Sequence, residues 1–411
     1  MDTVRRQYEA YPYPERDPAD EDNRLIIGSP SHLDEIRHYL FAGRRPPEPF
    51  RVLVAGGGTG DGLIMLADQC RAAGIEAEIT YLDLSTEARR IAQARAERRG
   101  LSSIRFHTGS LLDLESVGGG PFDYIDCCGV LHHLADPPAG LAALRDALSP
   151  GGGMGLMVYA PLGRTGVYPL QNALRSLTAG LEPSERVALG KTIVQSLPPT
   201  NWFVRNPGLG DHRNSDAGFY DLLLHSQDRA YTVREFAEYL ASAGLAPAAW
   251  LEPVRYDPMT YLKPEMAERL GNLDQVDKWA LAENLAGNIK MHTVYTVPVE
   301  RADSAVAQPR MADAIPISLG FDAPALGRAL SARKANRVLP IEFDGLTLRF
   351  VMPALAGPIL SAIDGKSSIR QIHKKIAGQS RGTLDWPAFM AQFQDLYRSL
   401  NGANKLLLRL D

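Results

Sequence analysis

The feature of this sequence that most constrains its fold is a glycine-rich turn directly after a short apolar segment. Residues 52–55 are apolar, residues 56–62 contain five glycines, and an apolar helical pattern continues from Leu63. Glycine can adopt positive φ and has no Cβ to hold a ligand away from the backbone. A helix that begins after such a turn also presents free N–H groups. The turn therefore predicts a ligand lying against the bend.

Alternating strand-like and helix-like segments around this turn predict a parallel sheet covered by helices. Strands are expected near residues 52–55, 77–82, 104–107, 124–128, 155–159, 248–254 and 291–297. Helices are expected near residues 31–41, 62–73, 86–99, 139–148, 170–177, 182–196, 232–243 and 265–285. The predicted fold class is α/β, a Rossmann-like doubly wound and mostly parallel seven-stranded sheet.

The length of 411 residues allows two or three domains. We expect an N-terminal arm and lid at 1–50, an α/β domain at 51–300 with an insertion at 161–230, a linker at 301–314, and a small α+β domain at 315–411. In this last part a hairpin is expected at 340–352 around Asp344-Gly345. Helical segments follow at 354–363, 369–376 and 386–400, and the whole looks like a winged-helix module.

The composition is that of an ordinary soluble globular protein. The net charge of −4 gives no overall attraction for polyanions, so nucleic acid is not an expected partner. A solvated helix face and a DNA contact are the two interpretations of one C-terminal cationic run: Lys366, Arg370, Lys374 and Lys375. The three cysteines lack metal-type spacing, which predicts a reducing cytoplasm and no metal site. No apolar run approaches the roughly 18 residues that span a bilayer, so no membrane partner is expected.

Tyrosines and prolines alternate near the N-terminus. Tyr8 and Tyr11 precede Pro12, Tyr13 and Pro14. Because prolines favour extended backbone, we expect these tyrosines on a rigid extended arm and not on a helix. The arm is either a strap that packs aromatic rings on the core or a lid over a ligand.

Asp83 ends the second predicted strand about twenty residues beyond the turn, where a carboxylate can accept hydrogen bonds from ribose hydroxyls. A dinucleotide reductase would share these two features. Two further segments distinguish this chain from a reductase better than the turn and Asp83 do. They are residues 129–134 after the fourth strand and Pro150 to Gly153 before the fifth. With them, residues 51–160 resemble the class I S-adenosylmethionine-dependent methyltransferases.

The resemblance implies S-adenosylmethionine as the cofactor. The residues it implies for cofactor binding are Tyr8, Gly56, Gly58, Thr59, Gly60, Asp61, Asp83, Leu84, Ser85, Ser110, Leu111, Gly129 and Leu131. Two positions depart from the family pattern, since Val54 and Ser110 stand where the family usually or often has an acidic residue. The cofactor's ammonium group therefore needs another acceptor, either a backbone carbonyl of the turn or Asp61.

Methyl transfer from a sulfonium is an in-line displacement, so the protein chiefly supplies alignment and exclusion of water. The expected catalytic residues are His133, as a base, and Tyr11 and Tyr13, whose ring faces can stabilise a cation. A packed or helix-capping role is the alternative for His133. Substrate binding is expected from Arg164, Tyr168, Asp216, Tyr220 and His225, with an internal salt-bridge network as the alternative for the insertion.

The arm, the insertion and the added domain resemble a bacterial group of methyltransferases, some relatives of which act on protein lysines. The expected acceptor is a protein side chain of the lysine type or a small molecule. A catalytically silent adaptor and an NAD(P)-dependent oxidoreductase are the alternatives. An appended C-terminal module can also form a homodimer contact or dock a peptide.

Overall fold

The computed structural model describes residues 2–118, 120–332, 337–379 and 384–410. The chain divides into two compact units. The first contains residues 1–33, 47–247 and 287–299, and the second contains residues 34–46, 248–286 and 300–411. These boundaries differ from the predicted domains 1–50, 51–300, 301–314 and 315–411, because the chain leaves the central sheet after residue 250 and returns only at residue 291.

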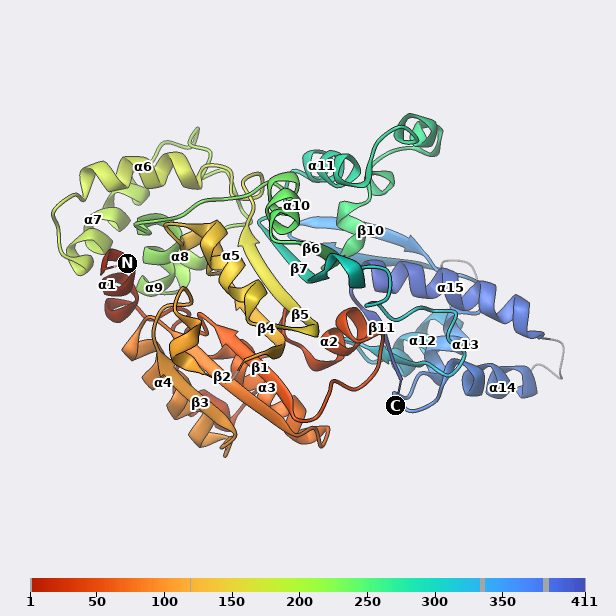
Figure 1. Cartoon of the computed structure of the whole chain (residues 1–411). Helices are drawn as coiled ribbons and strands as arrows, with labels where there is room; N and C mark the ends of the chain where they lie inside the picture. The colour runs from red at the N-terminus through yellow and green to blue at the C-terminus, as the bar shows by residue number, and fades with distance from the viewer. Residues whose placement is uncertain (1, 119, 333–336, 380–383, 411) are drawn as a thin grey trace. The chain divides into compact units, whose positions relative to one another are not determined.

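A seven-stranded sheet forms the centre of the α/β architecture, and the predicted fold class is confirmed. The strand order is β3-β2-β1-β4-β5-β7-β6, and β7 runs antiparallel to β5 while the pairs from β3 to β5 are parallel. Figure 1 shows β1 to β5 side by side. The strands are β1 (Phe50–Ala55), β2 (Ala77–Asp83), β3 (Ile104–Thr108), β4 (Phe122–Cys128), β5 (Leu148–Tyr159), β6 (Leu245–Trp250) and β7 (Met291–Pro298).

Helices connect the parallel strands, as expected for βα units. Those between strands are α3 (Asp61–Ala72), α4 (Thr86–Arg98) and α5 (Pro137–Asp146). The insertion after β5 contributes α6 (Val167–Leu177), α7 (Pro183–Gln195), α8 (Asp211–Asn214), α9 (Asp216–Phe219) and the π-helical turn η4 (Tyr220–Leu224), and α10 (Val233–Ser242) follows. Because β1, β2 and β4 are parallel, their carboxyl ends lie at the same edge of the sheet. A ligand is expected at this edge.

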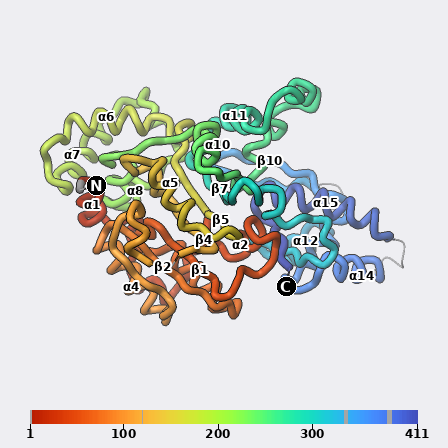
Figure 2. Tube along the Cα trace, viewed as in Figure 1, coloured from red at the N-terminus to blue at the C-terminus, as the bar shows by residue number. Residues whose placement is uncertain are grey.

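The N-terminal arm begins as a helix, α1 (Asp2–Ala10), followed by an irregular stretch and the 3₁₀ helix η1 (Pro18–Asp22). The prediction of an extended arm was therefore wrong for Tyr8, which lies in α1. The first proline is Pro12, and a proline disfavours helical backbone only at the residue directly before it. The residues up to Ala10 are therefore free to form a helix. Figure 2 shows this first segment in red, and Tyr8 of α1 donates a hydrogen bond to Asp221 of η4.

Two other sequence expectations shift. The strand predicted at 248–254 lies earlier, at β6, because it starts directly after Gly244 and Pro253 begins a 3₁₀ turn, η5 (Pro253–Tyr256). The helix predicted at 265–285 is interrupted: η7 (Pro264–Leu270) ends at Gly271, and α11 (Gln275–Ala286) starts anew with Asp274 accepting a hydrogen bond from the Asp277 N–H at 2.7 Å.

The second unit contains the predicted hairpin, formed by β9 (Val338–Phe343) and β10 (Leu346–Val351), with positive φ at Asp344 and Gly345. Its remaining elements include α2 (Leu33–Leu40, from Asp34 onward), β8 (Ile315–Ser318), α12 (Ala323–Ala332), α13 (Ala356–Ala362), α14 (Ile369–Gln379), α15 (Trp386–Gly402) and β11 (Leu406–Arg409). The winged-helix interpretation of this part stays a prediction. Among the residues described, no helix combines the length and apolar character needed to cross a membrane.

Candidate active site

A cavity of about 440 Å³ lies in the first unit at the carboxyl ends of β1, β2 and β4. Its position agrees with the rule that ligands of doubly wound sheets bind outside the carboxyl ends of the strands. Many of the residues predicted to form the site line it together: Tyr8, Tyr13, Gly56, Gly58, Asp61, Asp83, Leu84, Ser110, Leu111, Gly129, His133 and Arg164.

Asp83, at the end of β2, is held by backbone N–H groups. Its two carboxylate oxygens accept hydrogen bonds from the Gly58 N–H and the Ser85 N–H, each at 2.8 Å. Burial raises the pKa of Asp83, and these hydrogen bonds oppose the rise. The Leu84 backbone also hydrogen-bonds to Asp83. Since a carboxylate offers about four lone-pair positions, acceptor capacity remains for a hydroxyl donor in the cavity. Ser85 itself caps α4, so the helix does not need Asp83.

The glycine turn is shaped by the protein's own packing. Gly56 has φ +71°, and a Cβ there would lie 2.3 Å from Val130 Cγ2. Gly58 has φ +51°, and a Cβ there would lie 2.7 Å from the backbone carbonyl oxygen of Tyr13. The N-terminal arm thus lies directly against the turn, and Thr59 Oγ1 fixes it by donating to the Pro14 carbonyl at 2.7 Å. The arm forms part of the cavity wall, because Tyr8, Tyr13 and Pro14 line it.

An ion-pair network joins the arm, the glycine turn and α4. Arg95 donates to Glu21 at 2.8 Å, to Asp61 at 2.8 Å and to the Thr59 carbonyl at 2.7 Å. Arg16 donates to both carboxylate oxygens of Asp61, at 2.9 Å to Oδ1 and 2.6 Å to Oδ2. Burial raises the pKa of Asp61 and these arginines lower it, with a net fall. The carboxylate of Asp61 is therefore already paired, which argues against its predicted role as the acceptor of the cofactor's ammonium.

Two histidines bond to the two backbone polar groups of Gln227; His133 lines the cavity, and His225, predicted to bind substrate, does not. His133, at the end of the 3₁₀ turn η3 (Leu131–His133), has Nδ1 at 2.9 Å from the Gln227 carbonyl, while His225 Nδ1 accepts from the Gln227 N–H at 3.0 Å. The rings stack with centroids 3.7 Å apart. A carbonyl oxygen can only accept, so neutral His133 carries its proton on Nδ1 and leaves a lone pair on Nε2. Within the described structure that buried Nε2 has no hydrogen-bond partner.

His225 continues into a chain of hydrogen bonds. Because its Nδ1 accepts, its Nε2 donates to the Tyr8 hydroxyl at 3.1 Å, and Tyr8 donates to Asp221 Oδ1 at 3.0 Å. Tyr159 donates to Asp221 Oδ2 at 2.9 Å. Burial lowers the pKa of His225 well below its ordinary value, and the neighbouring His133 adds to this fall. Atoms of His133, Asp221 and His225 lie within 4.8 Å of one another, as metal ligands do, but these hydrogen bonds account for the arrangement.

The remaining predicted substrate residues do not form one cluster. Arg164 lines the cavity, stacks 3.6 Å over the Tyr159 ring and lies 3.6 Å from Asp228. Tyr168 lies farther out, with its ring 5.9 Å from the Arg164 guanidinium carbon. Asp216 instead pairs with Lys191.

Tyr220 and Tyr11 stack on each other with centroids 5.4 Å apart, and neither lines the cavity. The structure thus places Tyr11 in a packing cluster of the insertion and not beside Tyr13 at the cavity. Four of the predicted cofactor residues also do not line the cavity: Thr59, Gly60, Ser85 and Leu131.

Sequence reasoning missed several polar residues of the cavity: Asp126, Tyr159, Asp211, Asp221 and Lys290. Asp126 was visible as a carboxylate inside an otherwise apolar strand, which is costly unless it has a partner. The others come from segments whose approach to the cavity depends on the tertiary fold.

Comparisons with known proteins agree with this geometry. A family model described as a methyltransferase domain matches residues 53–154. An uncharacterized protein of Synechococcus is 32% identical over 294 residues, covering 68% of this chain and 67% of that protein. Residues 53–154 of the chain therefore form a methyltransferase domain. A ubiquinone biosynthesis O-methyltransferase of Caulobacter is 31% identical to this chain over 156 residues, or 36% of the chain and 58% of the relative's own length.

The fold also matches a solved structure. PKMT2 from Rickettsia typhi in complex with AdoHcy has a TM-score of 0.63 and 18% identity to this protein, with 93% of this chain and 75% of that chain covered. At this identity the likeness speaks for the fold alone.

The residues present fit the family's cofactor, S-adenosylmethionine. Asp83 keeps acceptor capacity for a ribose hydroxyl, and Leu84, Leu111 and Leu112 give the same cavity apolar walls against which an adenine ring would pack. Ser110 offers a hydroxyl beside them.

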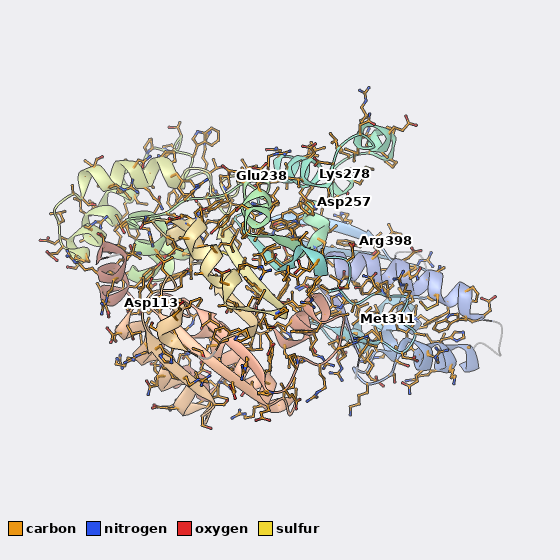
Figure 3. The ribbon with its side chains drawn as sticks, in the orientation of Figure 1. Asp113, Glu238, Asp257, Lys278, Met311 and Arg398 are labelled. Atoms are coloured by element: carbon orange, nitrogen blue, oxygen red, sulfur yellow. The ribbon has the colours of Figure 1, made fainter. Side chains whose placement is uncertain are left out.

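We predict that Asp83→Asn weakens S-adenosylmethionine binding by at least about tenfold, because hydrogen bonds to a charged acceptor contribute about 1.5–3 kcal/mol. Titration calorimetry measures this, and NADH serves as the comparison ligand. Asp113→Asn, an exchange of an exposed carboxylate labelled in Figure 3, is the matched control and should bind like the wild type. Equal affinity of the Asp83 and Asp113 variants would contradict the ribose role.

Asp126 makes the stability of the free protein depend on pH. Burial raises its pKa to about 7, with the Ser31 hydroxyl opposing the rise. The folded state therefore holds a proton between about pH 4 and pH 7 that the unfolded state has released, so stability falls as the pH rises through this range. We expect Asp126→Asn to melt at a higher temperature than the wild type at pH 8 and to differ less at pH 4. Thermal unfolding without cofactor tests this, and an equal difference at both pH values would contradict it.

Proposed function

We propose that this protein transfers the methyl group of S-adenosylmethionine to an amine acceptor of the lysine type, with His133 taking up the acceptor's proton. The observation that carries the proposal is the hydrogen bond from His133 Nδ1 to the Gln227 carbonyl. It leaves the buried Nε2 of this cavity-lining residue as an acceptor without a partner among the described residues. A base placed in this way needs no change of tautomer to act.

S-adenosylmethionine supplies an electrophilic methyl group on a sulfonium. In the transfer, the sulfur–methyl bond breaks, a nitrogen–methyl bond forms, and the proton lost by the ammonium acceptor moves to His133 Nε2. The chain aligns the acceptor and excludes water, which the arm at the cavity wall does through Tyr8 and Tyr13. The ring faces of Tyr13 and Tyr159 at the cavity can stabilise a cationic acceptor by roughly 0.5–2 kcal/mol.

The charge near the cavity favours a cationic acceptor. A second hollow shares Tyr13, Pro14 and Asp211 with the cavity and is also lined by Glu15, Arg16 and Asp17. Three carboxylates thus face one guanidinium, and Arg16 is already paired with Asp61. A negative rim attracts ammonium groups and raises their association rate. A small-molecule hydroxyl, as the name of the Caulobacter relative implies for that protein, is the other acceptor class.

The proposal is tested by incubating the protein with methyl-labelled S-adenosylmethionine and a lysate of the source cells, and separating products by size. We expect label in protein bands, recovered as methylated lysine after acid hydrolysis. Label only in small metabolites would replace the protein acceptor with a small molecule. Binding of NADH in place of S-adenosylmethionine would overturn the methyltransferase proposal altogether.

A further inference from the structure

Val54 leaves the cofactor's ammonium group without the acid that this position usually supplies in the family. In the sheet, Val54 of β1 is the register partner of Asp126 in the adjacent strand β4. Side chains at paired positions of neighbouring strands point to the same face. Both residues line the cavity. A carboxylate therefore lies one strand away from the place where it is missing.

Within the described part of the chain, Asp126 forms no ion pair with a cationic side chain. It is 5% exposed, and its Oδ1 has no hydrogen-bond partner among the described residues. Its Oδ2 lies so close to the first turn of α3 that a Cβ on Gly62 would be only 2.8 Å away. A buried carboxylate normally has a charged or hydrogen-bonding partner, because isolation in an apolar interior is costly. Asp126 has only the Ser31 hydroxyl as a hydrogen-bonding side chain among the described residues, and its Oδ1 remains a buried acceptor on a residue that lines the cavity.

The other carboxylates at this end of the cavity are already paired. Asp61 accepts from Arg16 and Arg95, and Asp83 accepts from the Gly58 and Ser85 N–H groups. We propose that Asp126 is a cofactor-binding residue that accepts the α-ammonium group of S-adenosylmethionine in place of the acid absent at Val54. The inference rests on the proposed methyltransferase function and adds the residue that neutralises the cofactor's amino-acid end.

The variant that tests this is Asp126→Asn, which keeps the side-chain shape and removes the charge. Calorimetry should show at least about tenfold weaker binding of S-adenosylmethionine, since the lost bond is charge-assisted. Binding of 5′-methylthioadenosine, which lacks the amino-acid arm, should stay unchanged. Asp113→Asn, an exposed aspartate, should bind both ligands like the wild type.

A measurement on the wild type needs no variant to fold. At pH 6 the binding of S-adenosylmethionine should release a proton, because an adjacent cation favours the ionised carboxylate, whereas 5′-methylthioadenosine should release none. The groups that interact with Asp126 are Ser31, Cys127 and Cys128, and burial raises the pKa of both thiols far above this pH. Calorimetry in two buffers of different ionisation heat reports the proton count.

The outcomes separate the two proposals. A wild-type protein that binds no S-adenosylmethionine would remove the methyltransferase function. A wild type that binds it, together with an Asp126→Asn variant of equal affinity and no proton release, would leave the function intact and overturn the role of Asp126. An equal loss of affinity for both ligands would mean that Asp126 only supports the cavity wall, and would also overturn it.

Discussion

Replacement of His133 by glutamine is expected to lower the rate of methyl transfer by about 10²-fold or more, the usual contribution of a positioned general base. Glutamine retains an amide that can reach the Gln227 carbonyl but has no basic nitrogen for the acceptor's proton. The affinity for S-adenosylmethionine should remain close to that of the wild type, since the proton transfer concerns the acceptor. The rate of label transfer to the acceptor found in the lysate, with saturating cofactor, measures the effect.

His132→Gln is the matched control for this prediction. The neighbouring His132 is equally buried, but its ring packs at 4.2 Å from the Tyr159 ring and does not line the cavity. A histidine that only packs should affect melting temperature more than turnover. Similar losses of turnover in both variants, with similar losses of stability, would assign His133 a packing role and remove it as the base.

Replacement of Arg95 by methionine is expected to destabilise the protein by about 3 kcal/mol, the lower end of the cost of breaking a buried ion pair, because Glu21 and Asp61 lose a buried partner while Arg99 still donates to Glu21. The Arg95 and Glu21 side chains are each only 1% exposed and lie 2.6 Å apart at their closest oxygen and nitrogen. Methionine fills much of the same volume without charge, so the loss reports the broken ion pairs and not a large cavity. Urea unfolding followed by circular dichroism measures the change in free energy.

Arg98→Met provides the comparison from the same helix. Arg98 pairs with Asp22, and these two side chains are 45% and 51% exposed. Exposed pairs contribute little because water solvates both partners well when they separate. The variant should unfold almost like the wild type. If the Arg95 and Arg98 variants lost the same stability, the burial of the Arg95 pair would not be the cause.

The fold could be predicted largely from local patterns. The continuous apolar run from Val52 to Ala55, the glycine turn and the helical period from Leu63 all indicate the same strand–turn–helix unit. Where such signals compete, boundaries moved: the segment predicted as one helix at 265–285 contains Gly271 and a new capping residue at Asp274. The helix α1 was missed because the extended backbone that prolines favour from Pro12 onward was also predicted for the residues before Pro12.

The site was predictable only where chemistry is carried by a contiguous motif. The turn and Asp83 belong to one βαβ unit, so their proximity follows from the topology. The partner of His133 is the backbone carbonyl of Gln227, 94 residues away. Because every residue has a backbone carbonyl, no pattern of side chains in the sequence could predict this partner. Tyr11 failed as a predicted site residue for a similar reason, since its stacking on Tyr220 depends on how the insertion folds back.

The N-terminal arm limits how far this protein can be truncated without losing part of the cavity wall. The family model ends at residue 154, but the cavity walls include Tyr8 and Tyr13 before it, and Tyr159, Arg164 and Asp221 after it. A fragment trimmed to residues 53–154 would keep the glycine turn and Asp83. It would lose the parts of the cavity wall that come from the N-terminal arm and from the residues after 154. The smallest unit able to hold a methyl donor away from water is therefore larger than the unit that sequence comparison recognises.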